Sequence, residues 1–342
     1  MNNKFYEKIK LFIHENYLFV LFNLVLIATL TYPLPYYIYA GGGTLSVKDK
    51  IVIENKKESS GSYNLCYVKE VRATIPTYVY SLINKDWEKV KLEEITLSKS
   101  ETNKDVVVRD RVYLKQSNQS AVISAFKLAN KKYEIIYNTP TVIFVMEEAN
   151  TDLKIGDSII SIDETPISKR DDILNITQTH NVGDKVKIKV KNNNKEYTRY
   201  ANIIEYNKVK ILGISLENII EYKTVPDVKF NFKPSEAGPS GGLILSLAIY
   251  DYLLDEDVTK GYKISGTGTI DLDGNAGEIG GVKYKLAGAV KNKSDIFFVP
   301  NGENYEEAIK IKKKRKYKIE VVGVDTLNDA VNYLNGLKVK KK

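Results

Sequence analysis

The chain has 342 residues, enough for about two domains besides any anchoring segment. Charged residues make up 27% and hydrophobic residues 43%, a globular composition that excludes a long disordered tail. The formal net charge of +8 is diffuse, and its densest blocks are Lys310–Lys318 and Lys338–Lys342. We interpret these blocks as solvated surface, with anionic lipid headgroups or wall polymers as the alternative contact. Nucleic acid is not expected as a partner, because no recognised binding module accompanies the charge.

One cysteine and two histidines limit the available chemistry. Cys66 excludes an intramolecular disulfide, and its apolar surroundings favour a core position. His14 precedes a hydrophobic span and His180 lies in a polar loop, so the sequence offers almost no suitable histidine for a Ser-His-Asp triad. Cysteine and histidine do not cluster at the spacing of zinc ligands, and we expect neither a metal nor a cofactor.

The first predicted element is a hydrophobic segment near the N-terminus. No charge occurs between Glu15 and Lys48, and apolar and aromatic residues continue from Tyr17 to Ala40. These about 24 residues suffice to cross a bilayer as one helix, so residues 16–40 are predicted to be a lipid-embedded anchor. A cleaved signal peptide, with small residues at its end, and a buried core helix are the alternatives.

Charge and aromatic residues predict the orientation of this anchor. Three lysines precede it, Lys4, Lys8 and Lys10, so residues 1–15 are expected in the cytoplasm by the positive-inside rule. Everything after about residue 40 then faces the outside of a cell membrane. The outer interface suits the amphipathic rings of three tyrosines: Tyr36, Tyr37 and Tyr39.

Residues 41–130 read as strands followed by a helix. Short β-rich runs begin at Ile51 and Tyr63. The second half of Asp110–Asn130 suits an amphipathic helix, with apolar positions at Ala121, Ile123, Ala125, Phe126 and Leu128.

Residues 131–208 form a compact segment with alternating signals. A strand is predicted at Thr141–Met146, then a turn at Gly156-Asp157 and a strand through Ile162. Ser168–Gln178 reads as a helix, and two strands flank Asn192-Asn193-Asn194 in a hairpin pattern. This order resembles a PDZ domain of the type found with bacterial proteases.

The resemblance to PDZ domains implies peptide binding, because PDZ modules add an extended peptide to an exposed sheet edge. The carboxylate-binding loop is expected ahead of Val142, within Tyr137–Pro140. No clear Gly-Leu-Gly-Phe-like loop occurs there, so a lid or spacer that binds nothing is the alternative.

From Val209 onward, β-rich and helical segments alternate, a rhythm of an α/β or α+β domain. Two glycine-rich junctions stand out in it: Gly238-Pro239-Ser240-Gly241-Gly242 and Gly280-Gly281-Val282-Lys283-Tyr284-Lys285. Between them lies Ser265-Gly266-Thr267-Gly268-Thr269-Ile270. In order and spacing these motifs resemble the proteolytic domain of Lon proteases, and the whole chain resembles the PDZ-containing, membrane-anchored Lon-like proteases of bacteria.

This resemblance implies an α+β fold, in which a PDZ-like β-rich domain at 131–208 is inserted into a Lon-type proteolytic domain. Residues 41–130 would supply its first part and residues 209–338 the part with the catalytic residues, after one N-terminal transmembrane helix. The resemblance also assigns Ser240 as nucleophile, Lys285 as general base and Thr267 as a supporting residue beside the lysine. Gly241 stands where the family commonly has alanine, and Ala237 replaces an acidic residue of the ATP-dependent enzymes; neither change touches the dyad.

The local chemistry agrees with a nucleophile at Ser240. Pro239 favours the first turn of a helix, and the apolar run that follows predicts a buried one. Backbone N–H groups of Gly238, Ser240 and Gly241 could then stabilise a developing negative charge. Taken alone, a serine in such a turn is more often a helix cap.

A lysine acts as a base only when it is neutral, which burial among apolar groups favours. Periodicity does not separate Lys285 from Lys283, and only the resemblance selects Lys285. A signal-peptidase-like enzyme also pairs serine with lysine on a membrane anchor, but it lacks the two glycine-rich contexts.

These observations predict an ATP-independent serine endopeptidase that cleaves exposed or unfolded protein segments outside the cytoplasmic membrane. The sequence has no Gly-x-x-x-x-Gly-Lys-Ser/Thr phosphate loop, which excludes ATP-driven unfolding within these residues. A homo-oligomer, a hexamer by family analogy, is expected. The alternative function is a membrane-anchored PDZ adaptor whose protease domain is inactive.

Overall fold

The computed structural model describes residues 3–54, 56 and 58–341, and the chain separates into two compact units. The first contains residues up to Gly41 together with Val68–Ile95. The second contains Gly42–Tyr67 and Thr96–Lys342. Two long strands, β1 (Tyr36–Ser46) and β3 (Ser62–Arg72), contribute residues to both.

The first unit begins with two helices, α1 (Asn3–Glu15) and α2 (Tyr17–Thr31). It also holds α3 (Ile75–Ile83), α4 (Leu92–Ile95) and β4 (Glu88–Lys91), which pairs antiparallel with Tyr36–Tyr39 of β1. No residue of α2 is buried. Among the described residues no single helix is long and apolar enough to cross a membrane, but Phe5–Glu15 and Tyr17–Thr31, bent by 88°, meet that criterion as a pair.

The predicted single helix across residues 16–40 is therefore wrong in its second half. Tyr32 is already extended where α2 ends, and Tyr36–Ala40 belong to β1. Pro33 and Pro35 explain the difference, because proline lacks the N–H that a helix needs and disfavours helical backbone in the residue before it. Tyr36, Tyr37 and Tyr39 thus lie in a strand.

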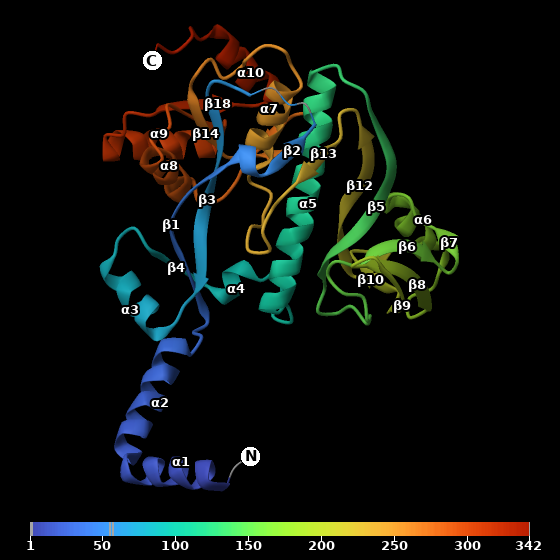
Figure 1. Cartoon of the computed structure of the whole chain (residues 1–342). Coiled ribbons are helices and arrows are strands. Elements are labelled where there is room, and N and C mark those ends of the chain that lie inside the picture. The colour runs from blue at the N-terminus through green and yellow to red at the C-terminus, as the bar shows by residue number, and fades with distance from the viewer. Residues whose placement is uncertain (1–2, 55, 57, 342) are drawn as a thin grey trace. The chain divides into compact units, whose positions relative to one another are not determined.

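A largely parallel sheet organises the second unit (Figure 1). Its strands run in the order β18 (Glu320–Val324), β17 (Ile296–Pro300), β14 (Lys263–Gly266), β3 and β1, and the first four are mutually parallel. Each strand sends alternate side chains to opposite faces. Leu65 and Phe298 pack with α5 (Asn103–Leu128), α7 (Gly242–Tyr252) and α10 (Leu327–Gly336). Cys66 and Phe297 pack with α8 (Val282–Lys291) and α9 (Glu303–Arg315) on the other face.

Short pairs of strands and one turn of helix complete this unit. A 3₁₀ turn at Val47–Asp49 leads to β2 (Ile51–Ile53), which pairs antiparallel with β13 (Val228–Phe230). A second pair consists of β15 (Thr269–Ile270) and β16 (Ala276–Gly277). The β2–β13 pair joins residues before residue 130 to residues after residue 209.

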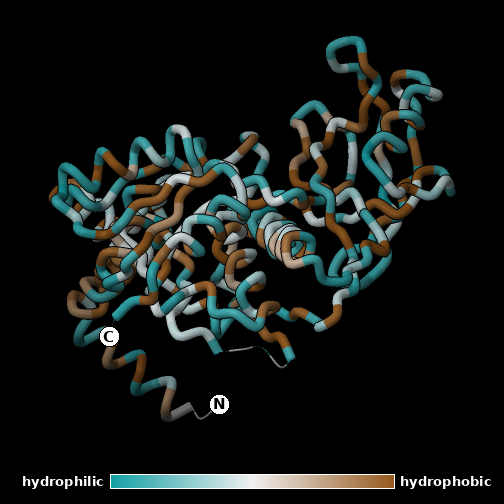
Figure 2. The backbone as a smooth tube through the Cα atoms, turned by 90° about the horizontal axis from the view of Figure 1, so that it is seen from above, coloured by the Kyte–Doolittle hydropathy of each residue, from teal (hydrophilic) through white to brown (hydrophobic). Residues whose placement is uncertain are grey.

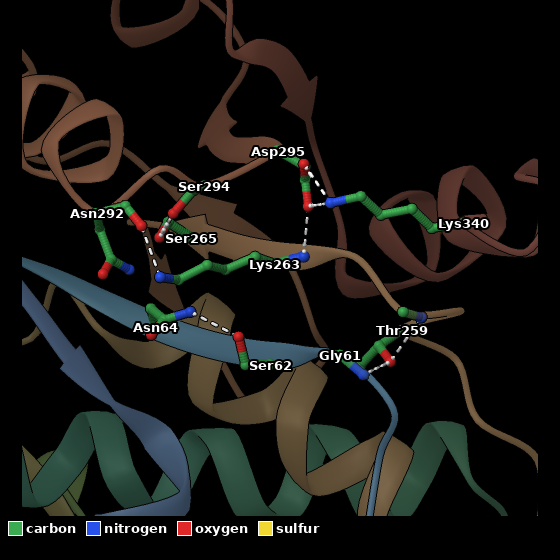
Figure 3. Close-up of polar contacts among 11 residues, drawn as sticks. Gly61, Ser62, Asn64, Thr259, Lys263, Ser265, Asn292, Ser294, Asp295 and Lys340 are labelled. Carbon is green, nitrogen blue, oxygen red and sulfur yellow. Dashed lines mark hydrogen bonds and ion pairs between the residues drawn. The ribbon is translucent and has the colours of Figure 1, made fainter. Parts of the chain in front are cut away.

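A polar network fixes the start of β14 (Figure 3). Asp295 accepts a hydrogen bond from the N–H of Lys263 at 2.8 Å and forms an ion pair with Lys340 at 2.6 Å. Ser265 and Ser294 share a hydrogen bond of 2.6 Å, and the Lys263 ammonium donates to the carbonyl of Asn292. These contacts hold the strand whose far end leads into Thr267.

The PDZ-like segment has its own sheet, in the order β12 (Ile214–Thr224), β5 (Tyr133–Val145), β6 (Ser158–Ile162), β8 (Lys185–Asn192) and β9 (Lys195–Asn202). The small strand β7 (Thr165–Pro166) pairs with β6, and α6 spans Arg170–Thr179. A hairpin of β10 (Ile204–Tyr206) and β11 (Val209–Ile211) follows β9. The predicted strands, helix and hairpin around Asn192–Asn194 are confirmed.

The predicted carboxylate-binding loop within Tyr137–Pro140 is wrong. These residues lie inside β5, which pairs antiparallel with β12 from Tyr133 to Val145. The ladder satisfies the backbone along one edge, so the chain has no reason to leave the strand there. Its partner β12 lies too far along the sequence for local turn signals to reveal it.

Helix α5 stands between the parallel sheet and the PDZ-like sheet in both views (Figure 1 and Figure 2). It starts with a capping box between Thr102 and Asp105 and continues to Leu128. The predicted helix in residues 110–130 is confirmed but begins earlier, at Asn103. Residues 117–126 are all buried, so this half is enclosed on every side and not amphipathic.

One hydrophobic core joins residues on both sides of the PDZ-like segment. It contains Ile51, Leu65 and Phe126 together with Val228 and Leu243. The PDZ-like segment has a separate core, built from side chains between Val142 and Leu212. The segment therefore interrupts one globular core, as an inserted domain does.

Candidate active site

Ser240 lies half-buried immediately before helix α7. The sequence predicts Pro239 at the start of this helix. In the structure the helix begins three residues later, at Gly242. Residues 242–249 of α7 are all buried, which confirms the predicted buried helix. Ser240 thus stands beside the N-terminal end of the helix, where backbone N–H groups favour negative charge.

The loop that carries Ser240 rests on α5. The N–H of Gly238 donates to the carbonyl of Asp110 at 3.1 Å, and the Ser117 hydroxyl donates to the carbonyl of Pro239 at 2.8 Å. A third contact joins the Arg111 guanidinium to the carbonyl of Pro234 at 3.2 Å. The Gly238 N–H, which the sequence analysis predicted to help bind an oxyanion, is thus engaged with Asp110 in this structure.

The conformation and packing of this loop require glycine at two positions. Gly238 has a φ of +96°, a conformation that residues with a Cβ rarely adopt. A Cβ on Gly242 would come within 2.8 Å of both Ile270 Cγ2 and Ser117 Oγ. The loop therefore depends on glycine at 238 for its turn and at 242 for close packing.

An ion pair holds the start of the same loop. The Lys50 ammonium lies 2.8 Å from the Glu236 carboxylate, and their side chains are 8% and 16% exposed. The N–H of Lys233 also donates to Glu236 at 2.8 Å. Burial by itself would raise the pKa of the Glu236 carboxyl, but the hydrogen bonds and the charge of Lys50 outweigh it and lower that pKa. No sequence signal pointed to Lys50.

Thr267 follows the end of β14 and is fully buried. Its hydroxyl donates to the carbonyl oxygen of Ser240 at 3.0 Å, and the N–H of Gly268 donates to the same oxygen at 2.8 Å. The N–H of Leu243 in turn donates to Gly268. Ser240 and Thr267 are therefore in direct contact, through the backbone of the serine.

Lys285 lies on α8 and is 5% exposed, whereas its neighbour Lys283 is half-buried and lies over the ring of Tyr284 at 5.0 Å. Burial thus separates two lysines that periodicity left equivalent. Lys285 belongs to the buried face of the helix with Val282 and Leu286.

Cys66 reports the surroundings of Lys285. Burial raises the pKa of the Cys66 thiol to about 12, against the opposing effects of the Ser265 hydroxyl and of nearby Lys285. Cys66 follows Leu65, which pairs with Gly266 at the end of β14. Lys285 and the Ser240–Thr267 contact therefore lie around the same strand end.

The described residues contain no group of three or more histidine, cysteine or acidic side chains that could hold a metal ion. The chemistry on hand in this region is a hydroxyl, a buried amine and backbone N–H groups. This combination suits acyl transfer through a serine.

Comparison with known proteins agrees with this geometry. Residues 219–335 match the family described as the Lon protease (S16) C-terminal proteolytic domain, and residues 126–202 match the PDZ domain family. The chain carries a Lon-type proteolytic domain and a PDZ domain. The predicted resemblance to a Lon-type proteolytic domain and to a PDZ domain is thereby confirmed, and the matches support a peptidase.

Individual relatives match parts of this chain. The Lon protease of Campylobacter jejuni is 28% identical over 193 residues, which are 52% of this chain and 22% of that protein. The Lon protease of Mesomycoplasma hyopneumoniae is 30% identical over 182 residues, 53% of this chain and 19% of that protein. Among solved structures, the PDZ domain of an SdrC-like protein from Listeria monocytogenes is 23% identical. It covers 24% of this chain and 92% of that domain, with a TM-score of 0.22. This chain thus spans about a fifth of the length of the two curated relatives.

Proposed function

We propose that this chain is an ATP-independent serine endopeptidase in which Ser240 is the nucleophile and Lys285 the general base. The observation that carries the proposal is the burial of Lys285, 5% exposed, next to a half-buried Lys283. Burial disfavours the charged form of an amine and so favours a lysine that can accept a proton. The Lon-type match over residues 219–335 spans Ser240, Thr267 and Lys285.

The proposed reaction is a two-step acyl transfer. Ser240 Oγ attacks the peptide carbonyl while Lys285 Nζ takes its proton, and the N–H groups of Ser240 and Gly241 stabilise the oxyanion. The lysine then donates a proton to the leaving amine, and a water molecule hydrolyses the acyl-enzyme. Thr267 supports the site by holding the carbonyl of Ser240 in place, and with it the serine.

Substrates would be exposed or unfolded protein segments. The 342 residues contain no phosphate loop for ATP, so no motor within them would unfold a folded domain. The PDZ domain would hold substrate peptides near the cleavage site, because PDZ modules bind extended peptides.

The bent helix pair would anchor the chain in a cell membrane. Apolar side chains of α2 are widely exposed, including Leu18 and Phe22 at 65% each, and a bilayer would bury them. Lysines ahead of α2 favour a cytoplasmic N-terminus, with the catalytic part outside. Assembly as a homo-hexamer is proposed by analogy with Lon-type domains.

The test is hydrolysis of an unfolded, fluorescently labelled protein by the full chain in detergent. Ser240→Ala and Lys285→Met should each reduce kcat by at least about a thousandfold, because members of one catalytic unit fail together. Lys283→Met, on the same helix, should retain activity. If the unaltered chain cleaves nothing yet binds peptides, the alternative of an anchored PDZ adaptor with an inactive protease domain replaces this proposal.

A further inference from the structure

A cavity of about 1100 Å³ lies between α5 and the PDZ domain. One wall is the N-terminal half of α5 with the residues just before it, and the other includes β5, β6, β12, residues 153–156 and the turn after β8. A smaller cavity of about 290 Å³ shares Arg111 and Lys115 with it, continues along α5 to Asn118 and is also lined by Phe230 of β13. We call the two together the α5 groove. None of the lining residues belongs to α6 or to the proposed catalytic set.

Five basic side chains line the larger cavity: Lys104, Arg111, Lys115, Lys154 and Lys191. Within the part of the chain that the structure describes, no salt bridge joins any of the four lysines to a carboxylate. These cations come from two walls, three from α5 and two from the PDZ domain. Their charges therefore converge on the space between them.

Four carboxylates also line the cavity, but two of them already form ion pairs. Glu101 pairs with the buried Arg109, and Glu196 pairs with Lys189 at 2.8 Å. Asp105 accepts hydrogen bonds from the N–H and the hydroxyl of Thr102 at the start of α5, and it keeps its negative charge because both donors are neutral. Asp105 and Glu221 are left to balance five cations, so the groove has a surplus of positive charge.

Lys115 lies where the two cavities meet. Partial desolvation lowers the pKa of its ammonium, the Glu221 carboxylate opposes that effect, and the Lys191 ammonium adds to it. One nearby carboxylate is thus not enough to stabilise this cation. A further anionic group in the groove would do so.

Asn118 adds a second, independent observation. It is 9% exposed, and its Oδ1 has no hydrogen-bond partner among the described residues. A buried amide oxygen without a partner is uncommon in a folded protein. Asn118 lines the smaller cavity, so this end of the α5 groove is polar and not only apolar.

The spacing of the cations indicates the size of the occupant. Lys104 and Lys115 are separated by about 16 Å along the helix, at about 1.5 Å per residue. An extended chain covers that distance in about five residues. Between the charges lie apolar side chains, among them Val108, Val112, Phe144 and Ile160.

We propose that the α5 groove binds an extended segment of a substrate protein, about five residues long, with acidic side chains among apolar ones. Cations spread along the groove fit several side-chain carboxylates better than a single terminal one. Ser117, one residue before Asn118, bonds to Pro239, so a segment on α5 lies on the helix that supports the Ser240 loop. This inference rests on the proposed function only in taking polypeptide as the substrate.

The test measures peptide binding to the full-length Ser240→Ala chain in detergent by fluorescence anisotropy. The probe is a labelled, C-terminally amidated octapeptide of alternating Glu and Leu, compared with its Gln analogue. Lys104→Gln/Lys115→Gln should weaken binding of the Glu probe about tenfold, which is about 1.4 kcal/mol. The control Lys310→Gln/Lys314→Gln removes two exposed lysines at helical spacing on α9 and should leave binding unchanged.

The Gln analogue should bind the Ser240→Ala chain, with all its lysines intact, about tenfold more weakly than the Glu probe does. Raising the salt concentration should also weaken binding of the Glu probe, because salt screens the charges. This arm does not depend on how the lysine variants fold. Equal binding of both probes, or an unchanged affinity in Lys104→Gln/Lys115→Gln, would overturn the inference. The inference would also be overturned if a neutral octapeptide bound with a free C-terminal carboxylate but not with an amidated one.

Hydrolysis of a neutral, unfolded substrate by the unaltered chain keeps the two proposals apart. Groove-dependent binding without any hydrolysis refutes the proposed endopeptidase and supports the groove. Hydrolysis without groove-dependent binding refutes the groove and supports the endopeptidase.

Discussion

Replacing Glu236 by glutamine tests whether the Lys50–Glu236 pair holds the Ser240 loop. The two side chains are 8% and 16% exposed, so glutamine would leave the Lys50 ammonium largely out of water without its counter-charge. Breaking a buried ion pair from one side costs about 3–5 kcal/mol. The remaining exposure of Glu236 and the cation–π contact of Lys50 with Phe232 favour the lower end, about 3 kcal/mol.

The pH dependence of this effect has a definite sign. The pKa of Glu236 is lower in the folded chain than its ordinary value of 4.5, so the pair stabilises the fold above that pH. The stabilisation is lost as the pH falls through the lowered pKa. Glu236→Gln should therefore differ from the unaltered chain at pH 7, and the difference should close below about pH 4.5.

Urea denaturation of the full chain in detergent measures the free energy of unfolding. The rate of peptide hydrolysis shows whether the Ser240 loop keeps its active conformation. The matched control is Glu196→Gln, which breaks the exposed pair with Lys189, 57% and 52% exposed. That change should barely alter the free energy of unfolding, because water and salt screen an exposed pair. Equal costs for the two variants, or a loss at position 236 that does not depend on pH, would refute the reasoning.

Three further results are expected. Gly238→Ala should cost about 1–2 kcal/mol in urea denaturation and reduce hydrolysis, because its φ of +96° strains any residue with a Cβ; an unchanged unfolding curve would contradict this. Gly242→Ala should cost about 1–3 kcal/mol, since its Cβ meets Ile270 and Ser117 at 2.8 Å, while Gly241→Ala, which meets the movable end of Leu65, should cost less; the reverse order would be decisive against the packing described. The Cys66 thiol, with a pKa of about 12 and 5% exposure, should resist iodoacetamide at pH 8 until the chain is unfolded, as mass spectrometry would show, and rapid alkylation of the folded chain would contradict its burial.

Local signals predicted much of the PDZ domain. Its strands alternate in character, and turn residues at Gly156-Asp157 and Asn192–Asn194 mark their ends. The expected loop at Tyr137–Pro140 failed because β5 continues by pairing with β12, a partner about 80 residues away. Pairing over that distance leaves no mark in a short window of sequence.

The helices show a similar division. The capping box at Thr102 and Asp105 was visible in the sequence and marks the start of α5, but the β-branched residues Val106–Val108 obscure a helical pattern. Hydrophobicity located the N-terminal segment, yet Pro33 and Pro35 decide where its helix ends. For helix ends, backbone constraints outweighed composition.

The site residues divide in the same way. Glycine-rich motifs and the family resemblance pointed to Ser240, Thr267 and Lys285. Periodicity alone could not rank Lys285 above Lys283, because their different burial comes from packing against strands far along the chain. Lys50 is 186 residues from Glu236, and no periodic pattern connects them.

The labelling of Ser240 by a fluorophosphonate, read by mass spectrometry of the full-length chain at neutral pH, tests most directly whether Lys285 activates this serine. Only an activated hydroxyl reacts at a useful rate. We expect one adduct on Ser240 that disappears in Lys285→Met and persists in Lys283→Met. An unlabelled Ser240 in a chain that still cleaves protein, or labelling that survives Lys285→Met, would contradict the Ser240–Lys285 mechanism.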